Sequence, residues 1–195
     1  PEYTAFPAGL RDGQDMEREA FGLVVVDTYF DAALASLPDD YLTLSVLALE
    51  QLPALAESLD AIGGGLSIAL DSGKLNTISR NRQRMRSLGD FESYGSDMVD
   101  LRHFIEVYAS LSGCDAATAL RALDAAVCYN RYTKNNLDNI GGISILVPQK
   151  TQKQYSAYAD AYDPMGLYAE YSAFVDGYVA SMSGGSYALS QLTPV

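Results

Sequence analysis

The chain has few of the residues that metal and thiol chemistry require. His103 is its single histidine, and Cys114 and Cys128 are its two cysteines. A structural zinc site takes four cysteine or histidine ligands, so these three scattered residues do not form one. If the two cysteines flank one helix, their fourteen-residue spacing corresponds to roughly 20 Å, which is beyond the reach of a disulfide. We therefore expect both thiols to be free and packed.

A catalytic thiol would need a base positioned beside it. His103 adjoins a predicted core face, and Cys114 follows it by about two helical turns and a bend. Nothing in this spacing directs the imidazole toward Cys114 or Cys128. An independent thiol enzyme that uses His103 is therefore the weakest of the functional hypotheses.

Positive charge is also scarce. The chain has thirteen lysines and arginines and twenty-five acidic residues, which gives a formal net charge of −12. Phosphate binding needs a basic surface, so a nucleic-acid partner is not expected. Four of the basic residues fall within seven positions and cannot share one helix face, which favours a solvated helix end over a binding patch; they are Arg80, Arg82, Arg84 and Arg86.

Several motifs are absent. No run of eighteen apolar residues could span a membrane, and no dinucleotide or triphosphate fingerprint occurs. The acidic residues do not pair at a spacing typical of glycosidases, and those over 12–17 lack the spacing of a calcium loop. Gly63-Gly64-Gly65 follows a predicted helix, so we interpret the triplet as a hinge or helix end.

Two stretches predict strands. Residues 42–47 alternate apolar and polar side chains. Residues 142–147 enter through a glycine and end at Pro148, and the apolar run over 143–147 is too short for a helix, which favours a strand buried on both faces. The residues before this strand, 125–132, are interpreted as the end of a buried helix.

About seven helices are expected around these strands. The first covers 17–37, with a core face of Phe21, Val25, Thr28, Tyr29 and Ala32. The others cover 50–59, with Pro53 in the first turn, 66–86 with a weak point at Ser72-Gly73, 97–111, 115–132 and two segments after Pro148. The sequence therefore predicts a mostly helical α+β fold in one lobe over 17–182, with an irregular segment over 1–16 and a tail over 183–195.

Tyrosine is concentrated near the C-terminus, where seven of the fourteen lie at or beyond Tyr155. They form two helical stripes that could stack on sugars, but such stripes are more often helix faces packed on a sheet. The stripes are Tyr155, Tyr158 and Tyr162, and Tyr168, Tyr171, Phe174, Val175 and Tyr178.

Four stretches occur in order: 43–49 with 52–55, then Asp100-Leu101 to Phe104, then 125–130, then 142–148. In turn they resemble the T-L-S-V-I-D-L-S-K-L strand and helix, the D-L-x-x-F helix start, the A-V-V-Y-N helix end and the G-L-S-I-Y-F-P strand of the clostripain-like cysteine peptidases. The resemblance covers about residues 20–180.

The resemblance implies that the catalytic histidine and cysteine lie upstream, in a caspase-like α/β half. Pro1 to Tyr3 would then be the remnant of a Pro-Gly-x-Gly-Trp-x-Tyr segment, although the chain has no tryptophan. His103 does not match the family's catalytic histidine. No catalytic, cofactor-binding or metal-binding residue is therefore assigned to this chain, and calcium is implied for the parent alone. A bacterial, secreted or cell-surface parent that cleaves after Arg or Lys is implied in the same way.

Two hypotheses remain. In the first, the chain is the C-terminal, non-catalytic portion of such a peptidase, inactive alone, and its strands complete a sheet with the upstream half. Part of its apolar surface would then be exposed. In the second, it is a stand-alone binding module whose surface includes Tyr168 and Tyr171.

Overall fold

The structure, a computed structural model, describes residues 18–36, 42–85, 97–133, 139–149 and 169–182. Within them it is α+β and mostly helical, with six α-helices and four short strands in two antiparallel pairs, which confirms the predicted fold class. The elements are α2 (Arg18–Ser36), β1 (Thr43–Leu47), the 3-10 turn η3 (Leu49–Gln51), α3 (Leu52–Asp71), α4 (Leu75–Arg84), β2 (Met98–Asp100), α5 (Leu101–Ser112), α6 (Ala116–Ala126), β3 (Val127–Tyr132), β4 (Ser144–Leu146) and α8 (Ala169–Met182).

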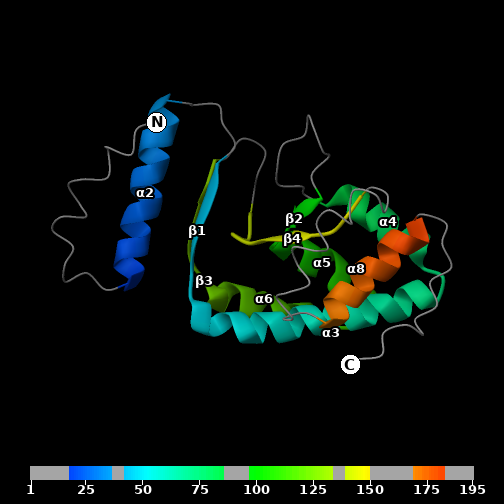
Figure 1. Cartoon of the computed structure of the whole chain (residues 1–195). Coiled ribbons are helices and arrows are strands. Elements are labelled where there is room, and N and C mark those ends of the chain that lie inside the picture. Colours follow the sequence, from blue (N-terminus) through cyan, green and yellow to red (C-terminus); the bar gives the residue numbers. More distant parts are fainter. Residues whose placement is uncertain (1–17, 37–41, 86–96, 134–138, 150–168, 183–195) are drawn as a thin grey trace, which may run out of the picture.

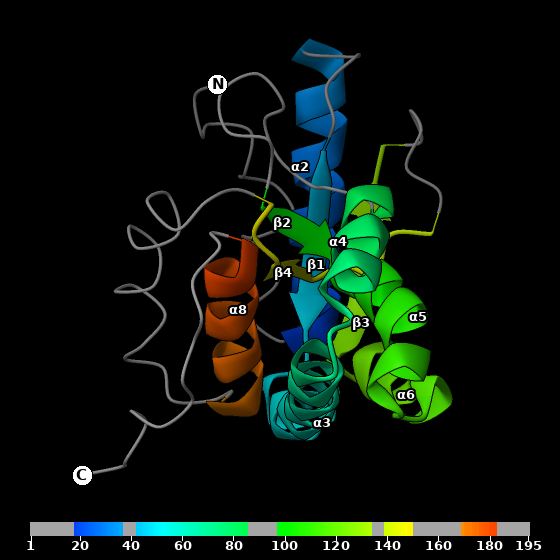
Figure 2. The ribbon, with the colours of Figure 1, turned by 90° about the vertical axis from the view of Figure 1, so that its right-hand side faces the viewer.

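The long helix α3 lies along the base of the molecule, and α8, α5 and α6 pack against it (Figure 1). Viewed from its right-hand side, α3 runs toward the viewer below α8 on one side and α5 and α6 on the other (Figure 2). These helices enclose the hydrophobic core, in which Ile62 and Leu66 of α3, Phe104 of α5 and Phe174 of α8 are all buried. At the opposite end, α2 stands outside the β1–β3 pair and packs against it.

The two predicted strands exist, and two more were missed. β1 and β4 lie within 42–47 and 142–147, but each pairs with a strand that the sequence had assigned to a helix: β1 with β3 and β2 with β4. The prediction that 125–132 ends a helix is wrong beyond Ala126. From Tyr129 onward the side chains alternate between the two faces of the strand pair: Tyr129 and Arg131 bond to α2, while Asn130 bonds on the opposite face. Cys128 is the extra residue of a bulge in this pair.

The glycine triplet is not a hinge. α3 continues through it to Asp71, and the missing side chains let neighbouring backbones approach the helix. A Cβ on Gly63 would lie 2.5 Å from the Cα of Tyr171 in α8, and one on Gly65 would collide with the carbonyl of Ser112 at the end of α5. The break predicted at Ser72-Gly73 is confirmed, since α3 ends there and Gly73 has a φ of +79°.

α2 has the predicted extent but a different rotation about its axis. The expected core face contains Phe21 and Tyr29, yet both residues are 42% exposed. Val26 and Phe30 are buried in their place, at 2% and 1% exposure. The segments over 1–16 and 183–195 lie outside the described residues.

Candidate functional site

The structure keeps His103 and Cys114 apart. His103 is in the first turn of α5, where its main-chain N–H donates to Asp100, and Cys114 follows the last turn. Eleven residues of mostly helical chain place the two about 16 Å apart along the axis. Cys128 is exposed at the bulge of β3. Across the described parts of the chain, no group of three histidine, cysteine or acidic residues could hold a metal ion.

Asp100 is a fully buried carboxylate between β2 and α5. One of its oxygens accepts the main-chain N–H of His103 at 3.1 Å, which caps α5, and the other accepts that of Gly141 at 2.7 Å. Charge-assisted bonds of this kind compensate for burial of the charge. Asp100 therefore joins the start of α5 to the chain that enters β4, and its role is structural.

Arg82 contradicts the prediction of a solvated helix end, because it is 1% exposed. Its Nε donates to the carbonyl of Val147 at 2.6 Å. Burial lowers the pKa of Arg82, and the carboxylate of Asp97 acts in the opposite direction. Arg80 and Arg84 are exposed, as expected, while Arg86 lies outside the described residues.

The tyrosines of α8 are not a stacking platform. Tyr171 is 7% exposed and Tyr178 is 1% exposed. The hydroxyl of Tyr171 donates to the carbonyl of Leu146 at 2.6 Å, and that of Tyr178 to the Oγ of Ser79 at 3.3 Å. The stripe is therefore a packed helix face, as interpreted, but the prediction that it packs on a sheet is wrong, because α8 packs mainly against the helix α3. Tyr155, Tyr158, Tyr162 and Tyr168 lie outside the described residues.

The bond from Tyr171 also closes one strand edge. The residues of β4 whose backbone faces β2 alternate with those that face away, and Leu146 faces away. Because the Tyr171 hydroxyl occupies the carbonyl of Leu146, β4 is poorly placed to accept a further strand at this position. The prediction that the strand over 142–147 joins a sheet elsewhere loses support at this residue.

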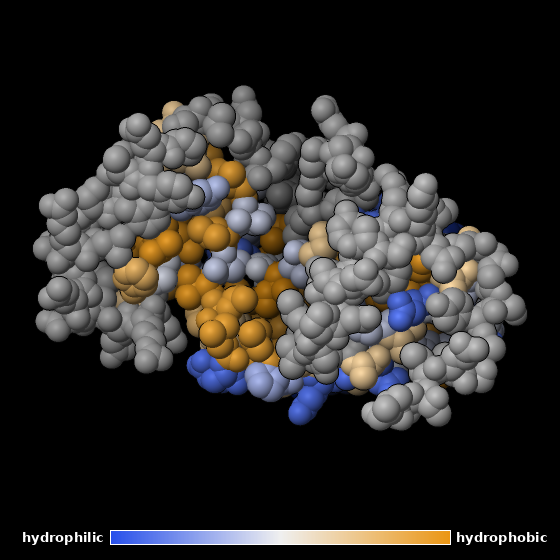
Figure 3. All heavy atoms as spheres, in the orientation of Figure 1, coloured by the Kyte–Doolittle hydropathy of each residue, from blue (hydrophilic) through white to orange (hydrophobic). Residues whose placement is uncertain are grey.

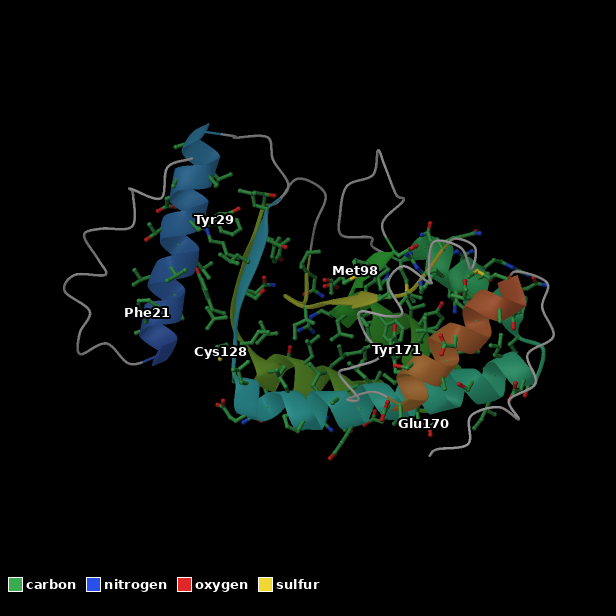
Figure 4. All side chains as sticks on the ribbon, viewed as in Figure 1. Phe21, Tyr29, Met98, Cys128, Glu170 and Tyr171 are labelled. Carbon is green, nitrogen blue, oxygen red and sulfur yellow. The ribbon has the colours of Figure 1, made fainter. Side chains whose placement is uncertain are left out.

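The surface that stands out is on α2, at the end of the molecule. Phe21, Val25 and Tyr29 follow one another at intervals of four residues, and we call them the outer stripe. Phe21 and Tyr29 are both labelled on the outlying helix in Figure 4. Figure 3 shows apolar residues along α2 and across the neighbouring strands on the same face. A helix with apolar residues on most of its sides is typical of one covered on two faces.

The opposite flank of α2 carries the charge. The guanidinium of Arg131 on β3 donates to Asp27 and to Asp31 at 3.0 Å each and lies 4.9 Å from the centre of the Phe30 ring. The hydroxyl of Tyr129 donates to the same carboxylate of Asp27 at 2.8 Å. The bond to Asp27 raises the pKa of Tyr129, and burial is the second cause. The bond to Asp31 is the main cause of the raised pKa of Arg131. We call Asp27, Asp31, Tyr129 and Arg131 the clamp.

The other face of the β1–β3 pair is also polar. The hydroxyl of Ser45 lies within hydrogen-bond distance of two acceptors, Asn130 Oδ1 and the carbonyl of Gly142. The Nδ2 of Asn130 donates to the carbonyl of Ile140. These bonds hold the strand pair to the chain that leads into β4. The pair therefore lies between α2 and this segment, and each of its strands has one partner strand among the residues that the structure describes.

Comparisons of the chain with protein-family models, curated proteins and solved structures found no match. Among the helices that the structure describes, none is long and apolar enough to cross a membrane. The outer stripe is visible in the sequence, but the pattern there predicts it as the core face. The signal that could have identified it is the nearly continuous run of apolar residues from Phe21 to Val26, which fits a helix covered on two sides.

Proposed function

We propose that the chain is the non-catalytic C-terminal lobe of a clostripain-like cysteine endopeptidase and packs against an upstream catalytic half of the same protein. The observation that carries the proposal is the outer stripe, in which Phe21 and Tyr29 are each 42% exposed on a helix with apolar residues on most sides. A partner that covered this stripe would bury the second apolar face of α2.

The strand pair beneath α2 supports the same proposal. β1 and β3 form a sheet of two strands in the described residues, and two-stranded sheets are marginal unless further elements extend or cover them. Since Tyr171 occupies part of the β4 edge, the β1–β3 pair is the better candidate for extension by a strand from another part of the parent.

The placement of the reactive side chains is consistent with a supporting role. Cys114 lies at the far end of α5 from His103, and the carboxylate of Asp100 is committed to two main-chain N–H groups. A stand-alone binding module that uses its tyrosines is less well supported, because Tyr171 is buried.

The test is to express this chain and the upstream region of its parent separately and together. Only the combination is expected to cleave peptides at Arg or Lys, and the two parts are expected to co-purify. Turnover by this chain alone that disappears in Cys114→Ala or Cys128→Ala would overturn the proposal. A parent gene with no peptidase-like region upstream would do the same.

A matched pair of substitutions separates docking from general apolar exposure. Phe21→Ser with Tyr29→Ser is expected to weaken association with the upstream half. Ile68→Ser is the control, because Ile68 is 69% exposed in the last turn of α3, and Figure 1 shows that α3 runs away from α2. Equal effects of the two changes would argue against the outer stripe as the contact surface.

A further inference from the structure

α2 carries two apolar stripes that compete for the inner position. The outer stripe is Phe21, Val25 and Tyr29, and the inner stripe is Gly22, Val26 and Phe30. They are offset by one residue, which is a rotation of about 100° around the helix. The outer stripe has the larger side chains, and on apolar area alone it should be the buried one. The structure nevertheless buries Val26 and Phe30.

The clamp lies where it can decide between these two rotations. Asp27 and Asp31 are one helical turn apart on the same flank of α2, and Asp27 is about 160° around the axis from Val25. When Arg131 and Tyr129 bond to this flank, the outer stripe must turn away from β3. The Arg131 guanidinium also lies over the Phe30 ring, which links the same contact to the inner stripe.

We propose that the clamp sets the rotation of α2 and so determines which apolar stripe faces outward. Its contribution is to orientation more than to stability, because partly exposed ion pairs add little net free energy. Buried or half-buried polar networks fix register in this way where apolar packing alone allows alternatives. The use of the outward stripe as a docking surface rests on the proposed function, but the rotation does not.

Shape at Gly22 is the rival explanation. A Cβ on Gly22 would lie 2.7 Å from a methyl carbon of Val46 on β1, so a rotation that placed Phe21 there would crowd the strand. If this fit alone sets the rotation, removal of the clamp will not change which stripe is exposed. The experiment must therefore measure exposure of both stripes in the same chain.

Thiol accessibility provides that measurement. In a chain with Cys114→Ser and Cys128→Ser, single probes are placed by Tyr29→Cys in the outer stripe and Val26→Cys in the inner one. With Arg131 present, the outer probe should react on the order of tenfold faster or more, because reaction of the inner one requires local opening. With Arg131→Met, the inner probe should react faster and the outer one more slowly, with helix content by circular dichroism unchanged.

Two controls keep the result specific. Arg102→Met removes the ion pair between Arg102 on α5 and Asp124 on α6 and should leave both rates unchanged. Asp31→Asn weakens the clamp from the α2 side and should shift the rates in the same direction as Arg131→Met. If the outer probe reacts faster than the inner one by the same ratio in both clamp variants, the proposal is overturned in favour of the fit at Gly22. Rates for both probes that reach those of the denatured chain would also overturn it, because the clamp would then attach the helix without choosing its rotation.

Discussion

Gly63 and Tyr171 lie so close that a methyl group on the glycine would be 2.5 Å from the tyrosine Cα. The contact marks the crossing of α3 and α8, which pack more extensively than any other pair of described helices. Two residues later, Gly65 faces the carbonyl of Ser112, while Gly64 between them points elsewhere. Of three consecutive glycines in one helix, the first therefore contacts the backbone of α8 and the third contacts the end of α5. The middle glycine contacts neither backbone.

Alanine substitutions along the triplet should have opposite signs. Gly63→Ala and Gly65→Ala should each lower the free energy of unfolding by about 1–3 kcal/mol, since a Cβ at either position forces neighbouring backbone to move. Gly64→Ala should raise it by up to about 1 kcal/mol, because a Cβ there meets only the Glu170 side chain, at 3.6 Å, and alanine favours the helix. Urea unfolding followed by circular dichroism measures all three.

The sign at Gly64 is the internal control. If Gly64→Ala destabilises the chain as much as its neighbours do, the glycines are needed for backbone freedom at a hinge, as the sequence suggested. If Gly63→Ala and Gly65→Ala are neutral, the close crossings do not hold the helices together.

The triplet also shows what local sequence can and cannot specify. A glycine that ends a helix and a glycine that allows close packing cannot be told apart from the local sequence. They differ in whether a segment distant in sequence packs against the helix at that position. Gly113 differs from the triplet, because its φ of +79° at the end of α5 is a local requirement. The existence of β1 and β4 was also predictable, from the alternation over 42–47 and the short apolar run over 143–147.

β2, β3 and the burial of Arg82 were not predictable, because each depends on a partner remote in sequence. No glycine or proline separates Val127 to Tyr132 from α6, and β1, which pairs with them, is remote in sequence. Arg82 lies among three other arginines, and nothing in the neighbouring sequence indicates that its Nε donates a hydrogen bond to the carbonyl of Val147. The candidate surface on α2 was found as a stripe but assigned to the wrong side for the same reason.

Tyr171→Phe should destabilise the chain by about 1–3 kcal/mol, since it leaves the buried carbonyl of Leu146 without its donor. Tyr178→Phe is the matched comparison on the same helix, where the lost bond to Ser79 is longer, at 3.3 Å, and a cost of about 1 kcal/mol or less is expected. Thermal unfolding of the two variants gives the ordering. A larger loss for Tyr178→Phe would contradict the role given to the β4 edge.

Asp100→Ala should cost more than the loss of an ordinary helix cap. The substitution removes the cap of α5 and also leaves the buried N–H of Gly141 without its acceptor. Together these losses should lower the free energy of unfolding by about 2–5 kcal/mol. Asp115→Ala, at the exposed cap of α6, should cost only about 1 kcal/mol. Asp100→Asn retains an acceptor and should fall between the two. Chemical denaturation of the three variants decides, and equal costs at both caps would show that the bond to Gly141 adds nothing.

High pH should unfold the chain through its buried tyrosines. Burial raises the pKa of Tyr108, whose hydroxyl donates to the carbonyl of Ile78, and it raises the pKa of Tyr178 as well. A group whose pKa is higher in the folded than in the unfolded chain contributes stability that is complete below its unfolded pKa and is lost above it. Each of these tyrosines should therefore remove about 1.4 kcal/mol of stability per pH unit above a pH of about 10.

The prediction is tested by following tyrosinate absorbance and circular dichroism together from pH 9 upward, a range set by the ordinary tyrosine pKa of about 10. Part of the absorbance change should coincide with loss of helix. Replacing both Tyr108 and Tyr178 by Phe should flatten the decline of stability with pH, even though the variant is less stable at neutral pH. Tyr29→Phe is the control, since its ring is 42% exposed, and it should leave the slope unchanged. Complete ionisation of the tyrosines in a chain that keeps its helices would show that Tyr108 and Tyr178 are accessible to solvent, contrary to the packing of α5 and α8.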